Sequence, residues 1–143
     1  MADLSDHLIT LAWELAKHKT KGDALHEVSV RRAVSTAYYA VLHALLRAFA
    51  EQVVRPEHRL DDAYSTVYRF PDHRPLLNSL LAASGDETLK NIATTFKALQ
   101  ELRMKADYDP RPLDIGDAEL ATVMEDAYWA AASIPTLDTR PRL

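Results

Sequence analysis

The stretch Arg31-Arg-Ala-Val-Ser-Thr-Ala-Tyr-Tyr-Ala-Val-Leu-His43, continued by Ala44-Leu-Leu-Arg-Ala-Phe49, decides the fold of this chain. Its apolar residues recur at helical spacing and predict a long helix that is central to its domain. At roughly 100° per residue, a polar stripe covers about a third of the circumference. The polar stripe consists of Arg32, Ser35, Thr36, Tyr39 and His43. It either faces a partner helix that satisfies it or lines a site.

The composition is that of one globular domain. The chain has 143 residues, of which 48% are hydrophobic and 27% are charged. Its 3 glycines favour a helical bundle over a β fold with many turns. Because the chain has no cysteine, disulfides, thiolate nucleophiles and cysteine-based zinc sites are excluded. A formal net charge of −4 argues against a globally basic nucleic-acid binder but leaves a local basic patch open.

Targeting and cofactor signals are weak in this sequence. The N-terminus lacks a basic region followed by an apolar run, so no signal peptide is predicted. No apolar stretch is long enough to span a membrane, and a cytoplasmic location is expected. His58, His73 and the pair Asp61-Asp62 match no standard metal-ligand spacing, so no metal or other cofactor is expected. The chain has neither a glycine-rich phosphate loop nor a serine elbow.

The spacing of apolar residues, together with capping and helix-breaking residues, predicts the remaining helices. One spans residues 5–16, with Ser5 as its cap and Leu11 on its core face. The central helix starts near residue 23 or 27 and ends at 54, before Pro56. Two more span residues 87–108 and 118–134, the last capped by Asp117 or Asp114. Short helices are predicted at 56–70 and 76–83.

These elements make up a single all-α domain over residues 1–143. The predicted architecture is a compact bundle with three long helices and one or two short helices inserted after the central one. Its core covers about residues 5–134, and residues 135–143 are expected to form a loose tail.

A second group of polar residues lies near the end of the helix predicted at 87–108. Arg103 and Asp107 are four residues apart and share one face. Asp107 falls in the last turn, where the helix dipole disfavours an anion, so its carboxylate needs a cation. Arg103, or Arg32 on the neighbouring helix, is the candidate. Farther back, Arg69 and His73 bracket a loop that reads locally as a solvated turn.

Two motifs together resemble those of HEPN-domain proteins. Residues 31–43 match the pattern R-x-x-x-S-x-A-Y-Y-A-x-x-H, and Arg103 to Tyr108 match R-x-x-A-D-Y. The segment Tyr68-Arg-Phe-Pro-Asp-His73 also resembles an R-x-F-x-x-H-like element of some relatives. The resemblance covers roughly residues 5–134 and implies a compact helical bundle that commonly forms a homodimer.

The resemblance also implies a set of activities. Many HEPN-domain proteins are metal-independent ribonucleases of toxin–antitoxin or other defence systems. Others bind nucleotide or nucleic acid, or serve as interaction modules. Active members carry R-x(4–6)-H near the end of the later long helix. Here the positions where that histidine would fall hold Tyr108, Asp109 and Pro110, so the motif is absent from its usual place.

The first functional hypothesis is a HEPN-like protein that binds RNA or a nucleotide between the polar stripe and the Arg103–Asp107 pair. If it is catalytic, it is a metal-independent endoribonuclease with Arg103 and His43 as its catalytic residues. The other candidate ligand-binding residues are Arg32, Tyr39, Asp107, Tyr108, Arg69 and His73. The expected partners are a second copy of the chain and a cognate antitoxin or nucleotidyltransferase.

The second hypothesis belongs to another class of protein. It describes a non-catalytic dimerisation or partner-binding module in which the same polar residues form a buried structural network. Arg103, Asp107 and Arg32 would then tie the long helices together.

Overall fold

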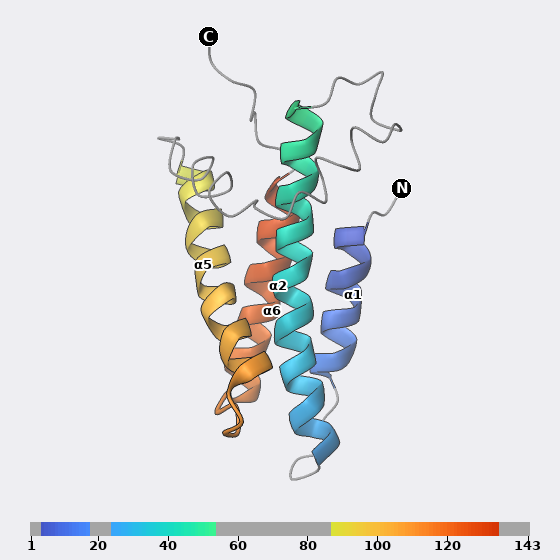
Figure 1. The fold of residues 1–143 in the computed structure, drawn as a ribbon, viewed down its shortest axis with the longest axis vertical. Helices are drawn as coiled ribbons and strands as arrows, with labels where there is room; N and C mark the ends of the chain where they lie inside the picture. The colour runs from blue at the N-terminus through green and yellow to red at the C-terminus, as the bar shows by residue number, and fades with distance from the viewer. Residues whose placement is uncertain (1–3, 18–23, 54–86, 135–143) are drawn as a thin grey trace.

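The computed structural model describes residues 4–17, 24–53 and 87–134. These residues form four helices and no strand, which confirms the predicted all-α bundle (Figure 1). The short helices predicted at 56–70 and 76–83 lie outside the described residues. The helices are α1 (Leu4–Ala16), α2 (Ala24–Val53), α5 (Glu87–Tyr108) and α6 (Asp117–Ser133).

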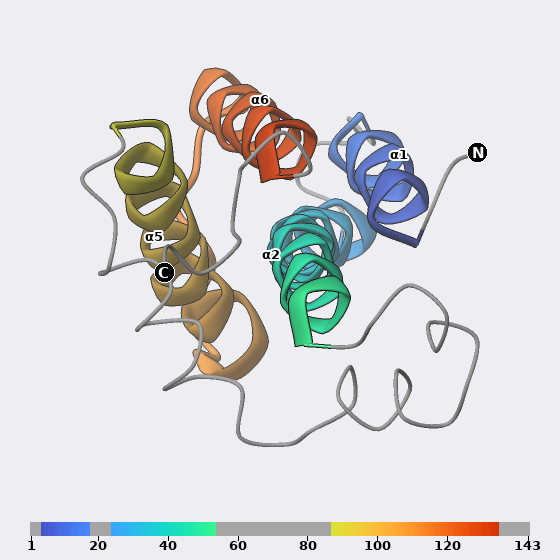
Figure 2. The ribbon, with the colours of Figure 1, turned by 90° about the horizontal axis from the view of Figure 1, so that it is seen from above.

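Helix α2 occupies the centre of the bundle. It packs against α5, α6 and α1, which lie to its left, above it and to its upper right when the molecule is seen from above (Figure 2). Its buried side chains include Val34, Val41 and Leu45, each no more than 1% exposed. They belong to one hydrophobic core to which all four helices contribute. The central helix predicted from the apolar periodicity is therefore confirmed.

Two predicted helix caps are wrong, and so is one predicted core residue. Ser5 lies inside α1, is buried, and donates a hydrogen bond from Oγ to the carbonyl of Ala40 on α2 at 2.8 Å. At the start of α6 the cap is Gly116, without a side-chain hydrogen bond, and Asp117 is the first helical residue. Leu11 is 49% exposed because it lies about a third of a turn away from the buried face of α1, which carries Ser5, Ile9 and Ala12.

Helix α5 ends where the sequence predicts. Its last residue is Tyr108, two positions before Pro110. A proline disfavours helical dihedral angles in the residue before it and lacks an N–H of its own, so the helix stops there. This ending places the last turn of α5 beside the first half of α2. Among the described helices, none is both long enough and apolar enough to cross a bilayer.

Candidate functional site

A cleft of about 480 Å³ lies between the first half of α2 and the last turns of α5. Both helices contribute residues spaced three or four apart, which a helix places on one face. The sequence predicted five of these residues as a candidate site, and the fold brings those five together. The cleft is lined by Val28, Arg31, Arg32, Ser35 and Tyr39 of α2 and by Arg103, Ala106, Asp107 and Tyr108 of α5.

Arg103 is the centre of a polar network across the cleft. Its Nε lies 2.8 Å from Asp107 Oδ2, which confirms the predicted ion pair, and both side chains are less than 20% exposed. Its Nη2 donates to the hydroxyl of Tyr39 at 2.7 Å. Ser35 Oγ donates to the same Asp107 oxygen at 3.3 Å. The network therefore joins two α2 side chains to two α5 side chains.

Three tyrosine rings surround the Arg103 guanidinium. Its Cζ lies 5.4 Å from the ring centroid of Tyr38, 5.3 Å from that of Tyr39 and 5.5 Å from that of Tyr108. A cation over an aromatic face is attracted by the ring quadrupole. Burial acts to lower the pKa of Arg103, but Tyr39 and Asp107 more than offset it and raise the pKa above its ordinary value. Arg103 is therefore a permanent cation.

Arg31 fastens the end of α5 to α2. Its Nη1 donates to the carbonyls of Ala106 at 2.9 Å and Asp109 at 2.7 Å, and its Nη2 donates to the carbonyl of Arg111. The last carbonyls of a helix have no partner within the helix, so a cation that satisfies them is a cap. This role was not predicted from the sequence. A signal for it existed in the sequence, because the residues that follow Tyr108, the last residue of α5, are Asp109 and a Pro-Arg-Pro run that offers no glycine cap.

Arg32 lies at the exposed side of the same cleft. Its side chain makes no hydrogen bond or ion pair with any described residue. Tyr108 is also open to solvent, with 66% of its surface exposed, while its ring covers Arg103. The cleft thus presents an unpaired cation and an exposed aromatic ring next to a buried, paired cation.

The other predicted site residues are placed differently. His43 lies one turn beyond Tyr39 on α2 and is half-buried; it does not line the cleft. Burial lowers the pKa of the His43 imidazole. Arg69 and His73 lie outside the described residues. Within residues 4–17, 24–53 and 87–134, no three metal-ligating side chains of the histidine, cysteine or carboxylate types come together.

The electrostatic character of the cleft is cationic. Three guanidinium groups line it against one carboxylate, that of Asp107. Arginines present planar, bidentate donors that suit phosphate and carboxylate groups. The fold and the cleft therefore define an all-helical protein with a cationic, tyrosine-lined cleft between two helices. Comparison with known proteins finds no family model, no curated protein and no solved structure that matches the chain.

Proposed function

We propose that the chain binds a phosphate-bearing ligand, RNA or a nucleotide, in the cleft between α2 and α5. The observation that carries the proposal is that Arg32, which has no partner among the described residues, and the exposed Tyr108 line the same cleft. A phosphate would accept hydrogen bonds from Arg32, and a base would stack on Tyr108. Proteins that hold single-stranded nucleic acid combine these two contacts.

The network behind the mouth supports the same proposal. A guanidinium group has five N–H donors, and Arg103 uses only part of them on Tyr39 and Asp107. Because Asp107 and Tyr39 fix its orientation, Arg103 offers its remaining donors without a large loss of side-chain entropy. The resemblance to HEPN-domain proteins points to the same class of ligand.

The proposal is for binding, not cleavage. A metal-independent ribonuclease needs a base within hydrogen-bond reach of the 2′-hydroxyl group. His43 does not line the cleft, and the R-x(4–6)-H motif is absent from its usual place. Incubation of the protein with the same RNA used for binding, followed by gel analysis, tests this part. We expect intact RNA, and specific cleavage lost in Arg103→Ala would overturn it.

The binding test uses a short fluorescein-labelled single-stranded RNA and, separately, ATP. Arg32→Ala removes the unpaired cation without breaking a contact in the described fold. We expect it to weaken binding about tenfold and to reduce the salt dependence by about one phosphate contact. Tyr108→Ala should weaken RNA binding by roughly 5- to 100-fold through the lost stacking.

Lys97→Ala is the matched control, because Lys97 is an exposed α5 cation that does not line the cleft. It should leave the affinity nearly unchanged. Equal losses for Arg32→Ala and Lys97→Ala would show that only net charge matters and would overturn the proposed site. Binding of neither RNA nor ATP would overturn the proposed function.

A second candidate function is a non-catalytic interaction module, and the Ser35–Asp107–Arg103–Tyr39 network favours it. Side-chain networks that join two helices fix how those helices pack. In this alternative, Arg103→Ala lowers the free energy of unfolding by about 1.5–3 kcal/mol, because Asp107 and Tyr39 lose the cation that joins them. Under the binding proposal, Arg32→Ala loses ligand affinity while the unfolding transition stays in place.

The resemblance also suggests partners for the chain. They are a second copy and a cognate antitoxin or nucleotidyltransferase of a defence system. These suggestions rest on the resemblance alone. Sedimentation across a range of concentrations tests the homodimer, and co-expression with the product of a neighbouring gene tests the other partner.

A further inference from the structure

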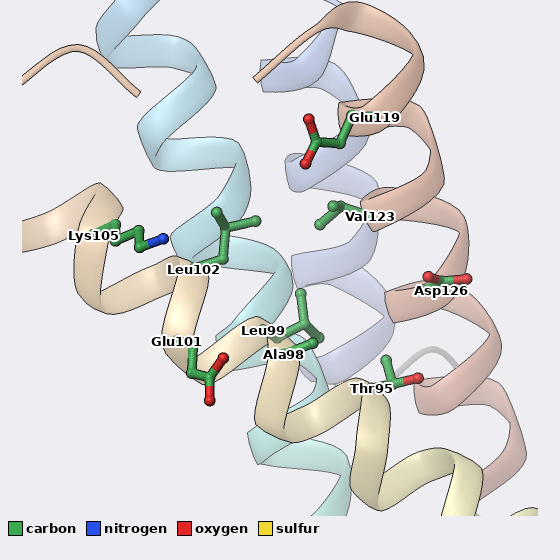
Figure 3. A pocket seen from close by; sticks show the side chains of 9 residues that line it. All are labelled: Thr95, Ala98, Leu99, Glu101, Leu102, Lys105, Glu119, Val123 and Asp126. Atoms are coloured by element: carbon green, nitrogen blue, oxygen red, sulfur yellow. The ribbon is translucent and has the colours of Figure 1, made fainter. Parts of the chain in front are cut away.

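A second groove runs between α5 and α6, apart from the cationic cleft. It has a volume of about 300 Å³, and side chains from both helices line it (Figure 3). The α5 residues recur at helical spacing from Thr95 to Lys105, and the α6 residues do so from Glu119 to Asp126. At about 1.5 Å per residue, these stretches correspond to roughly 10–15 Å of helix. The groove is therefore long enough for two to three turns of a partner helix.

The floor of the groove is apolar. It is formed by Leu99, which is 3% exposed, and by Leu102 and Val123, which are half-buried and pack against the core. Ala98 adds an exposed methyl group at the edge. Half-buried leucine and valine side chains at this spacing form the kind of groove into which the apolar face of an amphipathic helix packs.

The rims of the groove are acidic. Glu101 stands on the α5 side, and Glu119 and Asp126 stand on the α6 side (Figure 3). None of these three carboxylates has a hydrogen bond or ion pair with a described residue, and Lys105 is the only cation among the described residues that line the groove. A partner that covers the floor would bring its own charges against these rims. Cationic flanks would be attracted there, and anionic flanks would be repelled.

We propose that the α5–α6 groove is a docking site for a basic amphipathic helix of a partner protein. Apolar residues of that helix, spaced three and four apart, pack on the half-buried Leu102 and Val123, above the buried Leu99. Lysine or arginine residues on either side of that stripe pair with Glu101, Glu119 and Asp126. The site is independent of the cationic cleft, whose ligand is anionic, so one chain carries two binding surfaces of opposite charge.

The test uses a defined probe, a fluorescein-labelled helical peptide of about 14 residues. Leucines in the peptide recur every three or four residues, lysines flank them, and alanines fill the rest. A second peptide carries glutamate in place of every lysine. We expect the lysine peptide to bind the full chain, with a salt-dependent affinity, and the glutamate peptide not to bind.

Variants of the chain locate the binding. Glu119→Lys combined with Asp126→Lys should weaken the lysine peptide by about tenfold or more and allow the glutamate peptide to bind. Glu125→Lys is the matched control, because Glu125 is an exposed α6 residue next to Asp126 that does not line the groove. It should change the affinity by about twofold or less.

Several outcomes would overturn the docking site. One is equal affinity of the chain for the two peptides. Another is an equal change in peptide affinity for Glu125→Lys and for the Glu119→Lys, Asp126→Lys double variant. Binding of a small cation such as phenylethylamine, with no binding of the peptide, would mean a small-molecule pocket instead. Self-association that the double reversal abolishes would assign the groove to a second copy. RNA affinity is measured on the same groove variants and should stay unchanged. The peptide test is therefore separate from the test of the cationic cleft, because failure of the chain to bind RNA would not alter the peptide result.

Discussion

Arg31 and Arg32 are neighbours in the sequence, but their surroundings in the fold are opposite. The Arg31 guanidinium reaches across to α5 and donates to the carbonyls of Ala106, Asp109 and Arg111. Arg32, rotated by about 100° around α2, faces solvent at the cleft without a partner among the described residues. One residue stabilises the end of a helix, and the other is free to bind a ligand.

This contrast gives the first stability prediction. Arg31→Ala leaves the carbonyls at the end of α5 without their donors, and it should lower the free energy of unfolding by about 1.5–3 kcal/mol. Arg32→Ala is the control, with an expected change within about 0.5 kcal/mol. Urea denaturation followed by circular dichroism measures both. Equal destabilisation by the two substitutions would contradict the capping role of Arg31.

The Glu27 carboxylate links α2 to the segment before α6. Its carboxylate accepts a hydrogen bond from the N–H of Leu113 at 2.8 Å and another from Arg31 Nε at 2.9 Å. The bond from Leu113 is the largest effect on the Glu27 pKa; burial opposes it, Arg31 adds to it, and the pKa falls below its ordinary value of 4.5. Protonation therefore favours the unfolded chain.

The pH dependence follows from that sign. The stabilisation by ionised Glu27 is fully present above about pH 4.5, and it is lost as the pH falls through the lower pKa of the folded state. Glu27→Gln should lower the free energy of unfolding by about 1 kcal/mol at pH 7, with the deficit shrinking in acid. Glu125→Gln, at an exposed position on α6, is the control and should change the free energy of unfolding at pH 7 by less than about 0.5 kcal/mol. A Glu27→Gln deficit that stays constant from neutral pH to pH 3 would contradict the assignment.

At the scale of the elements, much of the fold could be predicted because the residues that start and stop its helices act locally. The predicted bounds 87–108 match α5, since Pro110 stops a helix whatever surrounds it. Ser5 could not be assigned in the same way. A serine near a helix start is a common cap, but here its hydroxyl bonds to Ala40 on another helix. That contact depends on how α1 and α2 cross, which no local pattern encodes.

The cleft shows the same division between local and tertiary information. Spacing on α2 and α5 placed Arg32, Tyr39 and Arg103 on faces that could meet, and the packing of the two helices joins them. His43 shares the polar stripe of α2 but lies a turn beyond Tyr39, farther along the helix than the cleft extends. The angular position of each residue around α2 could be predicted from the sequence. The height along α2 at which α5 packs could not.

At the scale of the whole molecule, one core unites the four described helices. Buried residues from α1, α2, α5 and α6 form a single cluster, with the side chains of α2 at its centre. Because all four helices pack on the same core, we expect them to unfold together and not one before the others. The tryptophans allow this to be tested, because Trp13 lies on α1 and Trp129 on α6.

We therefore expect the unfolding of the bundle to be a single cooperative transition. In the Trp129→Phe variant, Trp13 is the only tryptophan left and reports on α1, while far-ultraviolet circular dichroism reports on all the helices. The two denaturation curves should coincide. Leu45→Ala, at a position only 1% exposed on α2, should lower the free energy of unfolding by about 2–5 kcal/mol and shift both curves equally. If Trp13 reports an earlier transition than circular dichroism does, then α1 unfolds separately and the core is not one cooperative unit.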